Sequence, residues 1–201
     1  MYLKIANKCN TTIPLEMFTV LGISTNRHDD KAIGTFGSGF KLGINTCLRK
    51  NLNPTIFNNK QKIEFFTEPV KINDGLMSKE FYRVGYLVDN KKFMTSFSLE
   101  YGESDWEELA MGLREFVSNA LDRSIRENNN YDVNIEIVAD NQVRAKSGET
   151  RVFIPLSPDV QKFYKELPER FLHFKNKELL KQQILYKDKP TNARIYKNGV
   201  F

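Results

Sequence analysis

Two stretches of the chain carry residue types that could bind and process a phosphate group. Residues 33–43, IGTFGSGFKLG, hold four glycines and a lysine, and an apolar, helix-like run at residues 40–49 begins within this stretch. Glycines let a ligand approach the backbone closely, and the N-terminus of a following helix offers free N–H groups and a positive dipole end. The first stretch therefore predicts an anion-binding loop, with phosphate as the expected ligand. The alternative is a tight turn that packs a helix closely.

The second stretch is REFVSNALDRS, inside a predicted long helix. Glu115, Asn119 and Asp122 are spaced i, i+4 and i+7, which places them within about 60° of one another on one helix face. A carboxylate there can orient and deprotonate a water, and an amide oxygen one turn later can ligate Mg²⁺ held mainly by phosphate oxygens. Periodicity alone leaves a second interpretation open, an ordinary solvated face opposite the apolar stripe.

The glycine stretch does not fit the two commonest phosphate loops. A P-loop requires Gly-Lys-Ser/Thr at its end, but Phe40 follows Gly39, and Lys41 comes one position late. The dinucleotide fingerprint G-x-G-x-x-G fails as well, because Leu42 occupies the position of its third glycine.

The rest of the pattern predicts the elements that would position these residues. Strand-like alternation covers residues 2–6, 62–100, 133–139 and 151–155. Asp89-Asn90 is a hairpin signal, and a capping box at Ser104–Glu107 predicts a helix over residues 105–127. A lysine-rich helical stretch follows at 158–186, interrupted by Pro168. We therefore predict an α/β fold, a two-layer sandwich with a mixed, largely antiparallel sheet and helices on one face.

The composition fits one domain of this kind. The chain has 201 residues, of which 40% are hydrophobic, so we predict a single domain over 1–201 with a basic C-terminal extension at about 158–201. No apolar stretch approaches the roughly 20 residues of a membrane span, and the N-terminus lacks a secretory signal. Cys9 and Cys47 show no metal or redox spacing, which favours a cytoplasmic setting.

Charge is unevenly distributed along the chain. The formal net charge of +5 divides into +5 over residues 1–60, −4 over 61–130 and +4 over 131–201. A basic rim around an anion site would account for this pattern, as would nucleic-acid contact through the C-terminal third. Lysines and aromatic residues interleave there: Lys162, Lys165, Lys175, Lys177 and Lys181 with Phe163, Tyr164, Phe171 and Phe174. The competing interpretation is that these aromatic residues belong to the core.

Together the two stretches resemble the GHKL ATPase superfamily, which includes type II topoisomerase B subunits, the large heat-shock chaperones, histidine kinases and MutL-type repair proteins. The N box of that family reads E-x-x-x-N-x-x-D, as residues 115–122 do. IGTFGSGF at 33–40 is similar to the chaperone form of its G2 box, and LGISTNR at 21–27 resembles the lid segment that precedes that box. The resemblance implies the Bergerat fold, an α/β sandwich that binds ATP.

The resemblance also implies a role for each matching position. Glu115 would be the general base that activates the attacking water, Asn119 would bind Mg²⁺, and Asp122 would support the site. The backbone of the glycine loop would wrap the phosphates, with Lys41 as an additional contact. The loop residues are Gly34, Thr35, Phe36, Gly37, Ser38, Gly39 and Phe40, and the lid residues are Ser24, Thr25 and Arg27.

The chain departs from the family pattern in two respects. Its G2 box precedes its N box by about 80 residues, the reverse of the usual order, and a circular permutation of the kind found in small phage and bacterial ATP-binding proteins would account for this. The D-x-G-x-G motif of the adenine-reading G1 box is missing, and Asn7 or Asn10 would take the place of its acid. Thr150 lies in a stretch similar to the family's late Gly-Thr strand and would approach the base or the phosphates.

The expected function is therefore Mg²⁺-dependent binding of ATP, with slow hydrolysis to ADP that acts as a conformational switch through the lid. An unidentified protein partner would respond to the switch, and a homodimer is a candidate assembly because dimerisation is common in the family. Two alternatives stay open. One is a non-catalytic, nucleotide-dependent interaction module, favoured by the missing G1 acid, and the other is a nucleic-acid-binding protein.

Overall fold

The structure is a computed structural model of the chain that describes residues 1–23, 33, 37–73, 75, 77–104, 106–174, 184–185, 194–196 and 198–201. The helices are α1 (Glu16–Thr19), α2 (Gly39–Arg49), α3 (Leu109–Asn128) and α4 (Pro158–Arg170), with 3₁₀ turns η1 (Asp140–Gln142) and η2 (Leu172–Phe174). The strands are β1 (Tyr2–Lys8), β2 (Thr55–Asn58), β3 (Gln61–Asn73), β4 (Ser78–Val88), β5 (Lys91–Ser98), β6 (Val133–Val138), β7 (Glu149–Pro155), β8 (Ile184–Leu185) and β9 (Arg194–Ile195).

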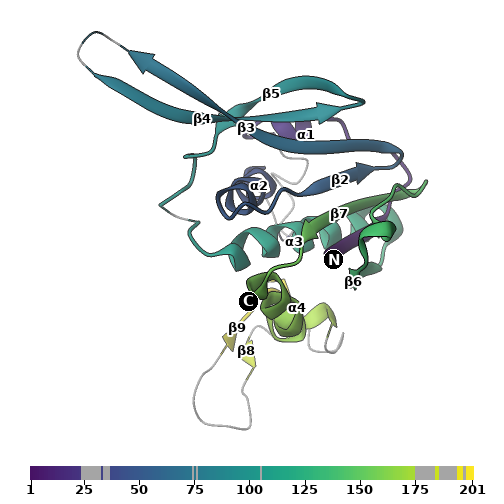
Figure 1. The fold of residues 1–201 in the computed structure, drawn as a ribbon. Coiled ribbons are helices and arrows are strands. Elements are labelled where there is room, and N and C mark those ends of the chain that lie inside the picture. The colour runs from purple at the N-terminus through teal and green to yellow at the C-terminus, as the bar shows by residue number, and fades with distance from the viewer. Residues whose placement is uncertain are drawn as a thin grey trace.

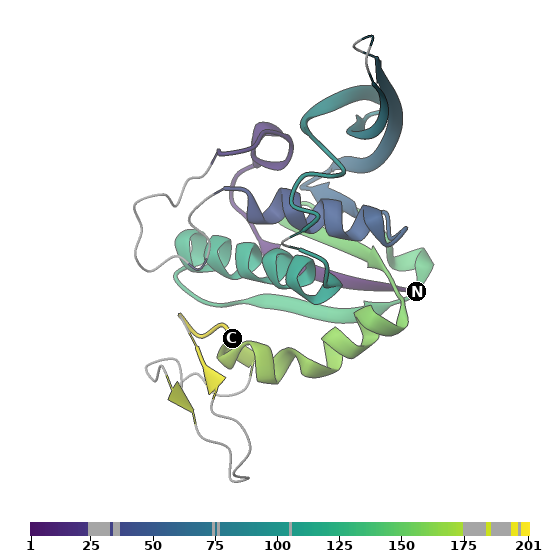
Figure 2. The same cartoon turned by 90° about the vertical axis from the view of Figure 1, so that its left-hand side faces the viewer.

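Seven strands form one sheet in the order β5-β4-β3-β2-β7-β1-β6, and β8 pairs with β9 separately. Figure 1 shows the sheet curving around α2 and α3, and Figure 2 shows α2, α3 and α4 following one another across the same layer. The predicted α/β class and the largely antiparallel sheet are confirmed. Every pairing among the described strands is antiparallel.

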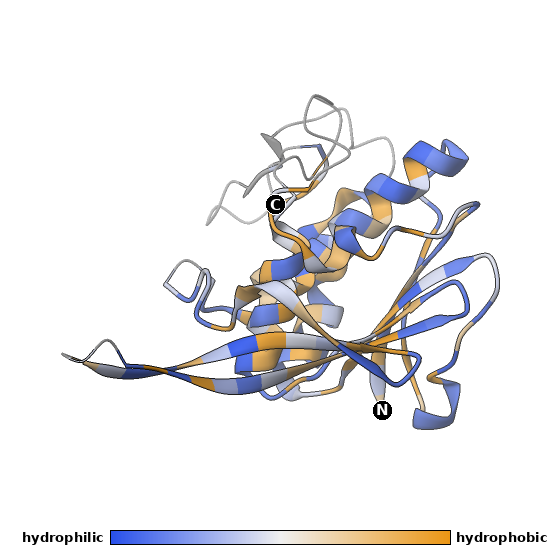
Figure 3. Cartoon of the chain, turned by 90° about the horizontal axis from the view of Figure 1, so that it is seen from above, coloured by the Kyte–Doolittle hydropathy of each residue, from blue (hydrophilic) through white to orange (hydrophobic). Residues whose placement is uncertain are grey.

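One face of the sheet packs on the helices because apolar residues alternate along the strands. Ile5 of β1 lies directly opposite Val152 of β7, and both join Leu113 of α3 in the main core. Figure 3 shows apolar residues concentrated where the helices meet the sheet. The other sheet face carries a smaller cluster, in which the rings of Phe57 and Phe153 meet edge-on with centroids 5.7 Å apart.

Two glycines form the crossing point of α2 and α3. A Cβ atom on Gly43 would lie 2.8 Å from the carbonyl oxygen of Gly112, and one on Gly112 would lie 3.1 Å from the Cα of Gly43. The helix backbones therefore touch with no side chain between them, and Phe116 packs beside this contact. The close crossing sets the N-terminal end of α2 against the middle of α3.

The start of α3 differs from its prediction. The helix begins at Leu109 rather than 105, its N-cap residue is Glu108, and no side chain caps it, so the predicted capping box at Ser104–Glu107 is wrong. Trp106 therefore precedes the helix, and its carbonyl accepts a hydrogen bond of 3.1 Å from Arg49. Contacts from α2, distant in sequence, hold this segment in place of a local cap.

The β3–β4 hairpin continues beyond the rest of the sheet as a two-stranded ribbon (Figure 1). Its edges are protected against pairing with another strand. The backbone N–H of Tyr82 donates to the Glu100 carboxylate at 2.7 Å on the β4 side. Pro69 of β3 lies opposite Tyr82, and because proline has no backbone N–H it cannot donate a hydrogen bond to another strand at this edge.

The C-terminal part contributes to the core rather than forming an exposed aromatic surface. Phe163 is 1% exposed and Phe171 is fully buried, while Tyr164 and Phe174 pack against the main core. The interpretation of these aromatic residues as core is therefore confirmed. Pro168 lies in the last turn of α4 and does not end it. Lys175, Lys177 and Lys181 lie outside the described residues.

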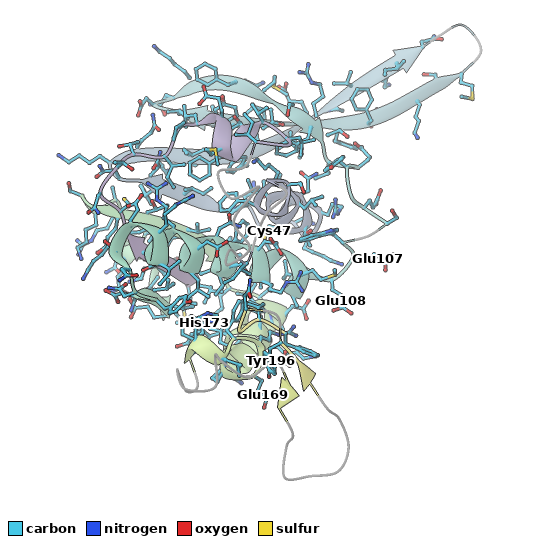
Figure 4. All side chains as sticks on the ribbon, turned by 180° about the vertical axis from the view of Figure 1, so that it is seen from behind. Cys47, Glu107, Glu108, Glu169, His173 and Tyr196 are labelled. Atoms are coloured by element: carbon cyan, nitrogen blue, oxygen red, sulfur yellow. The ribbon has the colours of Figure 1, made fainter. Side chains whose placement is uncertain are left out.

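Several potentially reactive groups are structural. Cys9 and Cys47 are free and buried, and burial raises the pKa of the Cys47 thiol on α2 to about 12 (Figure 4). Burial also lowers the pKa of His173 to about 4, and its ring packs edge-on against Tyr131. Neither side chain is charged near neutral pH. Among the described residues, no helix has the length and apolar character needed to cross a membrane.

Because the α2–α3 contact is between backbones, we expect Gly43→Ala to lower the free energy of unfolding by about 1–3 kcal/mol. The same change in an unobstructed helix would raise it by about 1 kcal/mol. Gly112→Ala, whose Cβ would meet Cα and Cβ atoms at 3.1 Å, should cost less. Urea denaturation measures both, and an unchanged or raised stability of Gly43→Ala would contradict the close crossing.

Candidate functional site

A cavity of about 350 Å³ is lined by residues of α2, α3 and the neighbouring strands β1 and β7. Ten predicted site residues line it: Asn7, Gly37, Ser38, Gly39, Phe40, Lys41, Glu115, Asn119, Asp122 and Thr150. Among the predicted residues that the structure describes, only Asn10, the alternative to Asn7, does not line the cavity. The other six, Ser24, Thr25, Arg27, Gly34, Thr35 and Phe36, lie outside the described residues. Four segments that are distant in sequence thus meet at one cavity.

The Glu115 carboxylate lies against the first residue of α2. A Cβ atom on Gly39 would stand only 2.1 Å from Glu115 Oε2, so glycine at this position makes room for the carboxylate. The Glu115 side chain is 15% exposed, and Asp122 is 6% exposed. The interpretation of this helix face as an ordinary solvated surface is therefore wrong.

Burial sets the acidity of Glu115. Loss of hydration raises the pKa of its carboxyl above the usual range, and the guanidinium of Arg114, 3.3 Å from Oε1, offsets part of that rise. Asp122 adds a smaller repulsion that also raises the pKa. A carboxylate held this way is a stronger base than an exposed glutamate.

The amide nitrogen of Asn119 is hydrogen-bonded within α3, and its amide oxygen can act as a ligand. Its Nδ2 donates to the backbone carbonyl of Glu115 at 2.7 Å, which turns Oδ1 away from the helix backbone. An amide oxygen suits Mg²⁺, which takes oxygen ligands and keeps several waters when phosphates supply the rest. Within the described ranges, no cluster of three or more His, Cys, Asp or Glu forms a cage for a metal. Asn119 therefore fits a magnesium ion carried in by a phosphate ligand.

Asp122 links the glycine stretch to α3. Its Oδ1 accepts the backbone N–H of Ile33 at 2.9 Å, and Ile33 opens the stretch that resembles the G2 box. The carboxylate therefore positions backbone at the cavity wall, which agrees with the supporting role that the resemblance implies for it.

Asn7 and Thr150 form a buried polar pair on adjacent strands. They lie directly opposite each other in the β1–β7 register and are 5% and 6% exposed. Within the described part of the chain the Thr150 hydroxyl has no hydrogen-bond partner. Asn7 donates from Nδ2 to the Lys8 carbonyl at 3.0 Å, which leaves its Oδ1 as an acceptor. Asn10, the alternative to Asn7, instead bonds the Glu127 carboxylate through its backbone N–H at 2.7 Å and does not line the cavity.

Several lining residues were missed by the sequence analysis. Three arginines of α3 also line the cavity: Arg114, Arg123 and Arg126. The helical spacing that pointed to Glu115 continues to Arg126 and could have found it. Trp106 also lines the cavity, because it precedes α3 instead of lying in its apolar stripe.

Comparison of the chain with models of protein families, with curated proteins and with solved structures gives no match. Function therefore has to be inferred from the residues that line the cavity.

The contact between Gly39 and Glu115 predicts a coupling that can be measured without any ligand. Gly39→Ala should cost stability in the wild-type background, because the new methyl displaces the carboxylate. In a Glu115→Ala background the same change should be neutral or stabilising. A double-mutant cycle by urea denaturation should give a coupling on the order of 1 kcal/mol. Additive effects would mean that the two residues do not touch.

Proposed function

We propose that the chain is a GHKL-type protein that binds ATP with Mg²⁺ in this cavity and hydrolyses it slowly. One observation carries the proposal: ten of the eleven described residues that the resemblance selects line one cavity, although they come from four separate segments. A glycine turn that only packs a helix would not need a buried carboxylate, an available amide oxygen and an unpartnered hydroxyl around the same space.

The residues that line the cavity offer two kinds of chemistry, one suited to a base and one suited to phosphates. Asn7 Oδ1 would accept a hydrogen bond from an exocyclic amine such as that of adenine, and the unpartnered Thr150 hydroxyl would bond the same base. Apolar side chains that line the cavity, among them Ile5 and Val152, would contact the ring faces. The backbone from Gly37 to Gly39 and the α2 N-terminus would receive the phosphates.

Glu115 would supply the base for hydrolysis. Its carboxylate would orient a water and take one of its protons as the water oxygen attacks the terminal phosphorus. The bond from that phosphorus to the bridging oxygen breaks, which gives ADP and inorganic phosphate. Mg²⁺, held in part by Asn119 Oδ1, would neutralise phosphate charge when bound.

The two alternatives differ in what they require of the cavity. A non-catalytic module would bind nucleotide through the same residues without turnover, so only rate measurements separate it from the ATPase. Part of the case for a nucleic-acid binder was aromatic residues that could stack on bases, and burial of Phe163 and Phe171 removes that part. DNA binding that weakens steeply with added salt would favour the nucleic-acid binder. The protein partner, the homodimer and the circular permutation remain predictions.

Nucleotide binding can be followed through Trp106, the only tryptophan in the chain and a lining residue of the cavity. We expect ATP and ADP, with Mg²⁺, to change its fluorescence and to raise the melting temperature, and GTP to bind more weakly. Thr150→Val should weaken ATP binding about tenfold through loss of one hydrogen bond. The free energy of unfolding of Thr150→Val should equal that of the wild type, because the hydroxyl that it removes has no hydrogen-bond partner among the described residues. No response to any nucleotide would overturn the proposal.

Hydrolysis should depend on Glu115. Glu115→Gln keeps the shape but removes the base, so we expect steady-state phosphate release to fall about 10²- to 10⁴-fold with ATP affinity preserved. Glu107→Gln is the matched control, since Glu107 is exposed just before α3 and projects from the body (Figure 4). Tight binding with no release of phosphate by the wild type would favour the non-catalytic module.

A further inference from the structure

Lys41 is the most deeply buried cationic side chain in the described part of the chain. It is 2% exposed and lines the cavity. Its Nζ donates to the carbonyl of Gly37 at 2.6 Å and to that of Ile23 at 3.4 Å. Among the described residues, no carboxylate lies within ion-pair distance of this ammonium. Two neutral carbonyl groups are thus its observed partners.

The charged groups that the structure describes around the cavity leave this ammonium without compensation. Four cationic and two acidic side chains line the cavity: Lys41, Arg114, Arg123 and Arg126, with Glu115 and Asp122. Glu115 is paired with Arg114, and Asp122 binds the Ile33 backbone. The described lining residues from α1, β1 and β7 carry no charge. An anionic ligand would therefore meet a desolvated cation that costs free energy while the site lacks an anion.

We propose that Lys41 makes the cavity select its ligand by charge, because its ammonium exchanges the Gly37 and Ile23 carbonyls for a phosphate oxygen of the bound nucleotide. This inference rests on the proposed nucleotide site. It goes beyond a static phosphate contact, since the residue would hold its proton more firmly with the ligand than without it. Nucleosides lacking phosphate would gain nothing from Lys41.

The direction of the pH effect follows from burial. Loss of hydration lowers the pKa of Lys41 to about 8. A phosphate at Nζ favours the charged form and raises this pKa again. At pH 8 about half of the free protein would carry a neutral amine, so binding would take up close to half a proton. Affinity would be level below pH 7 and fall above pH 8.

The test is isothermal titration calorimetry of ADP at pH 8, in two buffers with different ionisation enthalpies. The wild type should take up about half a proton more per ADP than Lys41→Met does. Lys41→Met should also bind ADP about 10- to 100-fold more weakly and adenosine equally well. Lys41→Arg keeps a permanent charge, so it should retain ADP affinity and lose the excess proton uptake. Lys50→Met, an exposed lysine at the end of α2, should match the wild type.

The outcomes separate this inference from the proposed function. ADP binding with equal affinity and equal proton uptake in wild type and Lys41→Met would overturn the role of Lys41 and leave the nucleotide site standing. Equal losses of adenosine and ADP affinity would overturn selection by charge. Absence of ADP binding in the folded wild type would overturn both. If Lys41→Met does not fold, Lys41→Arg decides, because unchanged proton uptake in that variant would contradict the proposal.

Discussion

The backbone contact between α2 and α3 is the constraint on which the candidate site depends. Because Gly43 and Gly112 have no side chains, the two helices approach closely enough for the Glu115 carboxylate to reach the first residue of α2. Gly39 then leaves the space that the carboxylate fills. A larger residue at the crossing would separate a buried acid from a helix N-terminus, and the cavity between them would lose its shape.

That close packing also explains the unusual charge states around the cavity. Burial raises the pKa of Glu115 and lowers that of Lys41, so both groups move toward neutrality. The same loss of water strengthens every interaction with a charged ligand, because the effective dielectric constant falls. If the site binds an anion as proposed, the burial that costs the free protein some stability would strengthen its contacts with that anion.

Local patterns were enough to predict part of this arrangement. The i, i+4, i+7 spacing holds for any helix, and Asp89-Asn90 adopts positive φ values of 50° and 62° that suit a tight hairpin turn. Features of the structure that depend on contacts between distant parts of the chain were not predicted. The four residues of β2 are a strand only because β3 and β7 flank them, and α3 starts late because Arg49 binds the segment before it. The choice of Asn7 over Asn10 required the strand register.

The reversed order of the two motifs does not argue against a shared site. Asn7 and Thr150 meet through antiparallel pairing of β1 with β7, although 142 residues separate them in the chain. The glycine stretch and Glu115 meet through a helix crossing that uses helix surfaces and no connecting loop. Neither contact depends on which segment is made first. A cavity assembled in this way can keep its chemistry when chain order changes, provided that the strand register and the glycine crossing are preserved.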